Sequence, residues 1–224
     1  MHLSRKQQPV HTEAAFSLVE MVAVIAILVT LMTAGISLLH GTGNQSRRAG
    51  MDMLTGMIEQ ARTTAITSRS YVVLAIAEPG DLPTNDGRCR LGLFKVAMDK
   101  WPPASGAPVT LEGTLMSRWQ TLNTGIVLIP GDVDKVPNPL DPNQQITIDY
   151  GGDKKLSVRV NAIAFNPRGG LHSPAGSTPI VFRIAEGSYR DGQAKANERG
   201  ADKTITESRL KVGRVTARPY QIDG

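Results

Sequence analysis

Cysteine, histidine and aromatic residues are scarce in this sequence. Cys89 is the only cysteine among 224 residues, which excludes an intramolecular disulfide and a cysteine-rich zinc or iron–sulfur site. The four histidines are too scattered for a histidine metal cluster, so we expect neither a metal nor a cofactor. Aromatic residues make up only 4%, which is little for stacking on bases or sugars. The net charge of +5 is mild and does not by itself indicate a nucleic-acid partner.

Hydrophobic residues are concentrated near the N-terminus. Residues 16–39 include 18 hydrophobic side chains and one charged side chain, Glu20. A helix of roughly 20 apolar residues is long enough to cross a bilayer. A secretory signal would have a shorter apolar core and a small-x-small cleavage site, which does not follow promptly here. The composition therefore predicts a retained membrane helix, with a buried core helix as the alternative.

The residues around this apolar segment form a recognisable order. A short polar leader carries Arg5 and Lys6 and ends at Ala14-Ala15, and the apolar segment then begins at Phe16. Glu20 is the fifth residue counted from Phe16. A carboxylate within an apolar helix is costly unless it has a partner or stays hydrated near the headgroups.

This order resembles the N-terminus of type IV prepilins and pseudopilins. The resemblance implies cleavage by a prepilin peptidase between Ala15 and Phe16, although Ala15 stands where glycine is usual. It also implies N-methylation of Phe16 and an assembly salt bridge between Glu20 and the Phe16 amine of a neighbouring subunit. The partners that it implies are the peptidase, other pilin or pseudopilin subunits, the inner-membrane assembly platform and the lipid bilayer.

A second helical segment follows the apolar one. Met51, Leu54, Ile58, Ala61 and Ala65 recur at spacings of three and four, which predicts one apolar face on a helix. We expect residues 41–70 to continue the first helix as its amphipathic half. The stretch 59–74, with its Ala-Arg-x-x-Ala motif, resembles the H-type minor pseudopilins of type II secretion and their FimT-like relatives.

The remaining sequence alternates between short apolar runs and turn residues. Strands are predicted at 71–77, 90–98, 109–115, 125–129, 145–150, 156–165, 179–185 and 211–215. The polar segment 187–204 is expected to be a mobile insertion before the last strand. The fold class expected is therefore α+β, with a long N-terminal helix packed on an antiparallel β-sheet domain as in pilins. The expected parts are a leader at 1–15, a transmembrane and filament-core helix at 16–40, the amphipathic continuation at 41–70, and a β-rich domain at 71–224.

Two other features are possible sites. Asp132, Asp134 and Asp141 lie in one loop, but their spacing does not fit a calcium loop, and a solvated loop is the favoured interpretation. Cys89 is expected to be a small buried hydrophobic residue.

The C-terminal tail is basic. It carries Arg209, Lys211, Arg214 and Arg218. Such a strip can contact phosphates, as in some FimT-like relatives of DNA-uptake systems, although a solvated or subunit-facing strand is favoured.

The function that the sequence favours is not enzymatic, and no catalytic residue is expected. We expect a minor pilin or pseudopilin, a structural subunit of a type II secretion pseudopilus or a type IV pilus. The resemblance to prepilins implies its location: the inner membrane, with a single span and a periplasmic C-terminal domain, before it joins the filament. The alternatives are a DNA-binding minor pilin that uses the basic tail and, less favoured, a membrane-anchored extracytoplasmic enzyme.

Overall fold

The structure is a computed structural model, and it describes residues 18–40, 42–83, 86–97, 109–140, 145–152 and 155–222, without the side chains of 32–40 and 42–44. The chain divides into two compact units, Met1–Thr42 and Gly43–Gly224. The first unit contains helix α1, Leu18–His40, and the second contains nearly all of helix α2, Thr42–Ser68, together with every strand described. We call the second unit the body.

The fold class predicted from the sequence is wrong. Among the described residues, β structure predominates, with 73 residues in strands and 50 in helices. Two separate helices of 23 and 27 residues replace the single long helix, because α1 ends at His40 and α2 begins at Thr42. In place of one antiparallel sheet, the body contains two large sheets and a short strand pair, so it does not have the expected pilin-like fold.

The membrane predictions also require correction. Among the residues that the structure describes, neither helix has the length and hydrophobicity that a bilayer crossing requires. The predictions of a transmembrane helix at 16–40 and of a single-pass inner-membrane protein with a periplasmic domain are therefore wrong.

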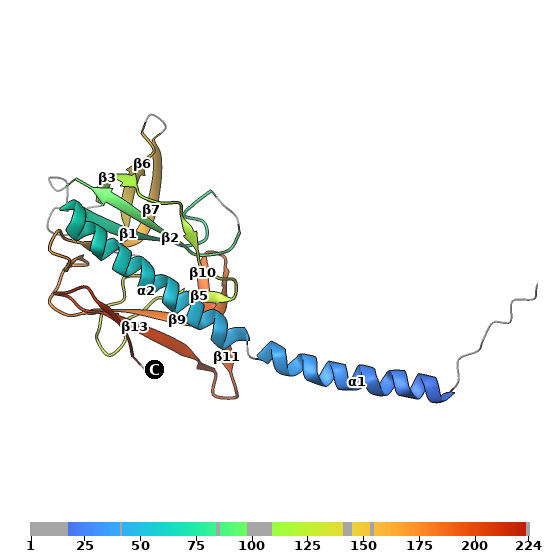
Figure 1. Cartoon of the computed structure of the whole chain (residues 1–224). Helices are drawn as coiled ribbons and strands as arrows, with labels where there is room; N and C mark the ends of the chain where they lie inside the picture. The colour runs from blue at the N-terminus through green and yellow to red at the C-terminus, as the bar shows by residue number, and fades with distance from the viewer. Residues whose placement is uncertain are drawn as a thin grey trace, which may run out of the picture. The chain divides into compact units, whose positions relative to one another are not determined.

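The first large sheet of the body closes on itself (Figure 1). Strand β1 pairs with β2, β2 with β3, β3 with β6, β6 with β7, and β7 again with β1. All of these pairs are antiparallel except β3–β6. The strands of this sheet are β1 Tyr71–Ala77, β2 Arg90–Val96, β3 Thr110–Leu115, β4 Gln120–Thr121, β6 Ile146–Tyr150, β7 Leu156–Phe165 and β8 Leu171–Ser173.

Ring closure explains why some strands are buried on both faces. Alternate residues of β1, such as Val73 and Ala75, join a core with Phe94, Ile148 and other residues of the ring strands. The remaining β1 residues face a second core. A strand covered on both sides is expected to be almost continuously apolar, as the β1 sequence Tyr-Val-Val-Leu-Ala-Ile-Ala is.

The second large sheet and α2 complete the body. Figure 1 shows α2 lying between the ring and this sheet, and residues from all three make up the second core. The predicted apolar face of α2 is confirmed, because Met51, Leu54, Ile58, Ala61 and Ala65 are all buried. The strands of the sheet are β5 Ile126–Ile129, β9 Ile180–Arg190, β10 Gln193–Ala196, β13 Glu207–Val212 and β14 Pro219–Ile222.

The predicted mobile insertion at 187–204 is instead regular β structure. Strand β9 continues to Arg190, turns at Asp191-Gly192 and pairs with β10. A short pair follows, formed by β11, Glu198–Arg199, and β12, Thr204–Ile205. Asp191 and Gly192 both have positive φ, as expected of a tight turn between antiparallel strands.

Candidate functional site

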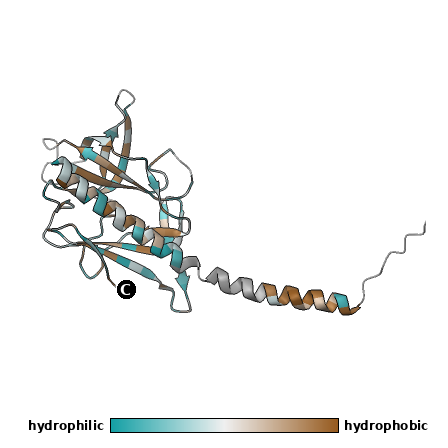
Figure 2. Cartoon of the chain, in the orientation of Figure 1, coloured by the Kyte–Doolittle hydropathy of each residue, from teal (hydrophilic) through white to brown (hydrophobic). Residues whose placement is uncertain are grey.

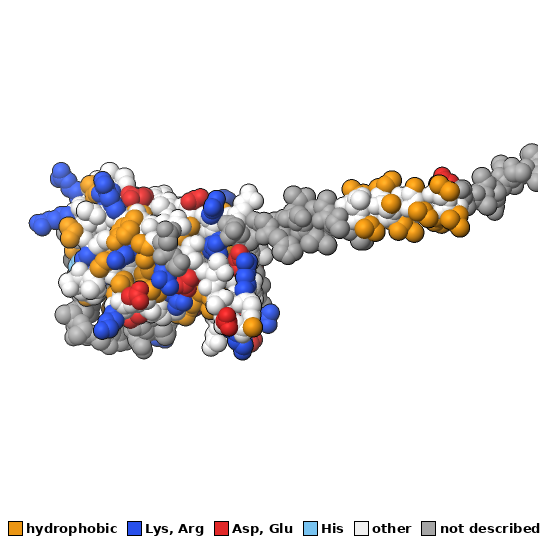
Figure 3. Space-filling view, turned by 90° about the horizontal axis from the view of Figure 1, so that it is seen from below, with side chains coloured by type: hydrophobic (Ala, Val, Ile, Leu, Met, Phe, Trp, Pro, Cys, Tyr) orange, Lys and Arg blue, Asp and Glu red, His pale blue; other side chains and the backbone are white. Residues whose placement is uncertain are grey.

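The described surface of α1 is apolar around the helix. Ten large hydrophobic side chains between Leu18 and Leu31 are each 47–80% exposed, and Glu20 is the only charged residue in that span. Figure 2 shows this part of α1 as predominantly hydrophobic, and Figure 3 shows apolar side chains on the face in view. A helix that is hydrophobic all round is normally buried in its functional state. The surface of α1 is therefore a candidate interface.

Glu20 lies in the first turn of α1 and is exposed. A carboxylate is favourable at this end of a helix because the unpaired backbone N–H groups carry partial positive charge. The predicted cleavage and methylation residues, Ala15 and Phe16, lie outside the described residues.

Two of the predicted basic tail residues lie on β13 and have partners on the protein. The Arg209 Nε donates to the Glu207 Oε1 at 2.7 Å. The Lys211 Nζ lies 6.0 Å from the centre of the Tyr220 ring, at the limit of a cation–π contact. As predicted, Arg209 and Lys211 share one face of the strand, but Glu207 lies on that face as well.

The other two tail residues lie in the loop between β13 and β14. The Arg214 Nε donates to the Thr178 carbonyl at 2.9 Å, and its Nη1 donates to the Pro174 carbonyl. Burial lowers the pKa of the Arg214 guanidinium. Arg218 is exposed. The four predicted residues therefore lie in two separate places, two of them on β13 and two in the loop that follows it.

The β13–β14 loop meets two other segments at the end of α2. The Arg62 Nε donates to the Thr216 carbonyl at 2.6 Å, and the Leu171 N–H donates to the Arg214 carbonyl at 2.9 Å. Gly169 lies against Ile66, where a Cβ would stand 2.6 Å from the Ile66 Cδ1, and its φ of +80° also favours glycine. The three segments are residues 59–69, 166–170 and 213–218.

These three segments together are strongly basic, and we name them the arginine-rich end. They contain five arginines and one glutamate, with no lysine or aspartate. Figure 3 shows Lys and Arg side chains projecting from the left end of the body. The arginines are Arg62, Arg69, Arg168, Arg214 and Arg218. Sequence reasoning missed the first three because they lie far from the tail in the chain.

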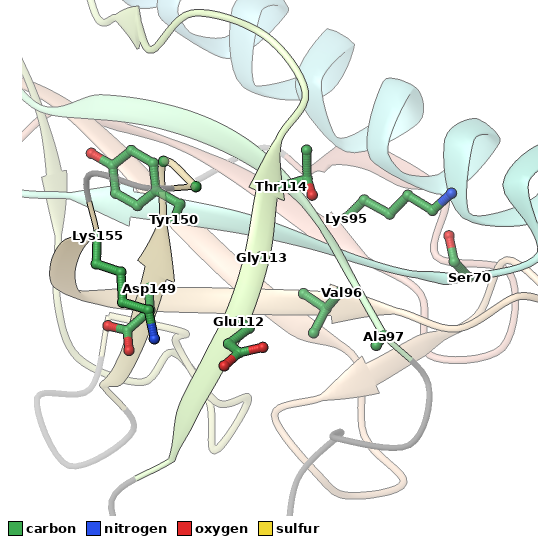
Figure 4. Close-up of a pocket in the computed structure, with 12 residues that line it drawn as sticks. Ser70, Lys95, Val96, Ala97, Glu112, Gly113, Thr114, Asp149, Tyr150 and Lys155 are labelled. Atoms are coloured by element: carbon green, nitrogen blue, oxygen red, sulfur yellow. The ribbon is translucent and has the colours of Figure 1, made fainter.

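A pocket of about 770 Å³ is lined by residues of β2, β3 and β6, by the segments that follow β2 and β6, and by Ser70. Glu112 and Asp149 are directly opposite each other across the parallel β3–β6 pair. Figure 4 shows Lys95 and Lys155 on opposite sides of β3. Two carboxylates and two ammonium groups balance, so the described lining does not select a ligand of one charge.

The structure also describes Cys89 and part of the loop that holds the predicted aspartates. Cys89 is fully buried, as expected. The Asp132 Oδ1 accepts a hydrogen bond from the Asn138 backbone N–H at 2.9 Å, and Asp141 lies outside the described residues. No cluster of three or more metal-ligating side chains occurs in the part of the chain that the structure describes.

Comparison with protein families, with curated proteins and with solved structures gives no match to this chain. Its function is therefore inferred from the residues of the chain and their arrangement.

Proposed function

We propose that this chain is a structural subunit of a pilus or pseudopilus filament, released from its leader by a prepilin peptidase and without enzymatic activity. The observation that carries the proposal is the exposed surface of α1 with its single carboxylate. Such a surface is stabilised when α1 helices of neighbouring subunits pack together. The order of leader, Ala15, Phe16 and Glu20 in the sequence supports the same function.

Helix packing supplies the driving force in this proposal. Burying a large aliphatic side chain contributes roughly 1.5–3 kcal/mol, and α1 exposes ten such side chains between Leu18 and Leu31. Glu20 opposes this burial unless it gains a charged partner. Cleavage before Phe16 would create an ammonium group four residues away in sequence. Pairing of that group with Glu20 of a neighbour makes burial of the carboxylate favourable only in the assembled state.

Crosslinking between α1 helices tests this proposal. Leu28→Cys places a thiol on the exposed α1 surface, whereas the native Cys89 is fully buried. We expect disulfide-linked dimers of the Leu28→Cys chain in the cells that produce it. Adding Glu20→Ala should lower their yield at least about tenfold, because the carboxylate loses its partner. N-terminal sequencing of the same material should begin at Phe16.

The matched control is Val215→Cys, since Val215 is 84% exposed on a loop of the body. It should not give the Glu20-dependent product. Equal dimer yields with and without Glu20→Ala, or a mature chain that begins at Met1, would contradict the assembly proposal.

A second candidate function is nucleic-acid binding by the arginine-rich end. The observation that favours it is the gathering of five arginines with one glutamate, because phosphate contacts provide the sequence-independent part of nucleic-acid affinity. Arg62 and Arg214 already donate to backbone carbonyls, and Arg209 and Lys211 also have partners on the protein. Arg168 and Arg218 are therefore the better candidates for phosphate contacts.

Two double variants separate these basic groups. Arg168→Ala with Arg218→Ala should weaken binding to a labelled DNA duplex about tenfold and flatten its salt dependence. Arg209→Ala with Lys211→Ala is the matched control and should change the affinity less than twofold. Fluorescence anisotropy from 50 to 300 mM salt measures both. Affinity that is insensitive to salt, or a larger loss in the control, would exclude this candidate.

A further inference from the structure

A short acidic turn follows β1 and is held by reciprocal hydrogen bonds. The Glu78 backbone N–H donates to the Asp81 Oδ2 at 2.8 Å, and the Asp81 backbone N–H donates to the Glu78 carbonyl at 3.1 Å. Pro79 and Leu82 form an isolated bridge across the turn. We name residues 78–82 the acidic turn. Glu78 and Asp81 are both partly buried, and the charge of Asp81 acts on the Glu78 carboxyl.

The acidic turn packs against both sheets. Leu82 lies against the core inside the ring. Gly192, in the β9–β10 turn, lies close to Pro79, since a Cβ on Gly192 would be 3.6 Å from the Pro79 carbonyl oxygen. The turn is therefore a junction between the ring and the second sheet. Opening the acidic turn should expose the residues packed against it, while the strands within each sheet stay paired.

The groups that face Glu78 come from three parts of the chain. They are Asp81 in the same turn, Cys89 just before β2 and Tyr189 on β9, while Arg159 on β7 faces Asp81. The Tyr189 hydroxyl accepts a hydrogen bond from the Leu128 N–H at 3.2 Å and lies within hydrogen-bonding reach of the Cys89 sulfur. The only cation in this set acts on Asp81.

We propose that the acidic turn is a pH-sensitive clasp, closed while the Glu78 carboxyl holds its proton and locally opened when Glu78 ionises to a carboxylate. The proton passes to solvent, and no other covalent bond changes. With Glu78 ionised, two carboxylates lie side by side in a partly buried turn. Moving the Glu78 carboxylate into water relieves both the desolvation and the repulsion.

The electrostatics of the turn favour opening when Glu78 ionises. Burial, and then the nearby Asp81, raise the pKa of Glu78 to about 7. Burial also raises the pKa of Asp81, although the hydrogen bond from the Glu78 N–H and the charge of Arg159 oppose this. Because the pKa of Glu78 is higher in the closed turn than in an open one, closure is fully favoured at pH below about 4.5. That advantage is lost as the pH rises through about 7.

Cys89 is a built-in reporter of this opening. It is the only cysteine, it is fully buried, and its thiol pKa is raised by burial and by Glu78. A thiol reagent reacts with it only after a local or global opening. The thiolate fraction also rises with pH, so labelling rates are compared between two proteins at the same pH. Because Glu78 raises the pKa of the thiol, its charge alone would slow labelling of the wild type, so a faster wild-type rate reports opening.

The test compares the full-length chain with its Glu78→Gln variant, which keeps the shape of the protonated side chain but cannot ionise. At pH 5.5 the two labelling rates should agree within twofold. At pH 8.5 the wild-type rate should be about tenfold higher. Glu198→Gln removes an exposed carboxylate on β11 and should retain the wild-type pH profile.

Hydrogen exchange separates local from global opening. The amide of Asp81 should lose protection in wild type between pH 5.5 and 8.5, relative to Glu78→Gln, while amides of β13 should not. A rate ratio that stays near one at both pH values would overturn the clasp. Equal loss of protection at Asp81 and β13 would also overturn it, since the opening would then be global.

Discussion

Replacing Gly187 by alanine should lower the free energy of unfolding by about 3 kcal/mol. Gly187 lies on β9 directly opposite Ala196 of β10. A Cβ at this position would stand 2.2 Å from the Lys195 carbonyl oxygen and 2.9 Å from the Ala196 Cα. It would also stand 2.9 Å from the Val127 Cγ2, on the neighbouring strand β5.

The loss in free energy of unfolding is large because backbone atoms cannot move aside as the end of a flexible side chain can. Relief requires β10 to shift away from β9, which strains the cross-strand pairing and displaces the neighbouring hydrogen bond from the Gly187 N–H to the Gly125 carbonyl. Urea unfolding followed by circular dichroism measures the effect. The midpoint should fall while the slope with denaturant stays unchanged.

Gly56→Ala is the matched control for this substitution. Gly56 is an exposed residue within α2, and a Cβ there meets nothing within 4 Å. Alanine is about 1 kcal/mol more favourable than glycine in a helix interior, so this variant should be stabilised by roughly 0.5–1 kcal/mol. A Gly187→Ala protein as stable as wild type would show that β10 does not approach β9 this closely.

The sequence predicted those elements that have a clear apolar pattern and bury most of their residues. Strands 71–77 and 156–165 agree with β1 and β7 in both bounds, because their apolar residues face cores on one or both sides. The face of α2 was predicted for the same reason, since its apolar residues recur with the helical period. These patterns are local, so they carry no information on how strands pair. Closure of the ring, with its parallel β3–β6 pair, was missed.

Segment 187–204 was mispredicted because its strands are held by backbone pairing at the surface. Their burial patterns are exposed or intermediate along β10, β11 and β12, so no hydrophobic period marks them. The Asp-Gly pair at 191–192 was the available signal, since this dipeptide favours a two-residue hairpin turn.

The candidate sites also differ in whether the sequence alone could identify them. Glu20 could be identified from sequence because a charge within an apolar helix is anomalous by itself. The arginine-rich end could not, because Arg62 and Arg168 come from segments about 100 residues apart that meet only through the fold, where Gly169 lies against Ile66. The bilayer-crossing prediction rested on the composition of residues 16–39 alone.

Replacing Glu207 by glutamine should cost about 2 kcal/mol at pH 7, and the cost should vanish on acidification. Glu207 bridges two arginines: the Arg183 Nη2 lies 2.7 Å from its Oε2, and the Arg209 Nε lies 2.7 Å from its Oε1. Its side chain is only 8% exposed. Arg183 and Arg209 are directly opposite each other on β9 and β13, where like charges destabilise a sheet. Removing the carboxylate therefore leaves two cations facing each other.

The pH dependence follows from the same contacts. Burial would raise the pKa of Glu207, but the hydrogen bonds from Arg183 and Arg209 and the charges of both lower it below its ordinary value. A lowered pKa in the folded state stabilises the fold fully above about pH 4.5, and this stabilisation is lost as the pH falls through the folded-state value. The difference between wild type and Glu207→Gln should therefore be constant from pH 7 to 5 and shrink toward pH 3.

Urea unfolding at pH 7, 5 and 3 measures this difference. Glu198→Gln is the control for removing a carboxylate from an exposed strand, and it should change the stability by less than about 0.5 kcal/mol. Adding Arg209→Gln to Glu207→Gln removes one of the facing cations, so the double variant should recover part of the loss at pH 7. A Glu207→Gln cost that persists undiminished at pH 3 would mean that packing, rather than charge, accounts for the role of this residue.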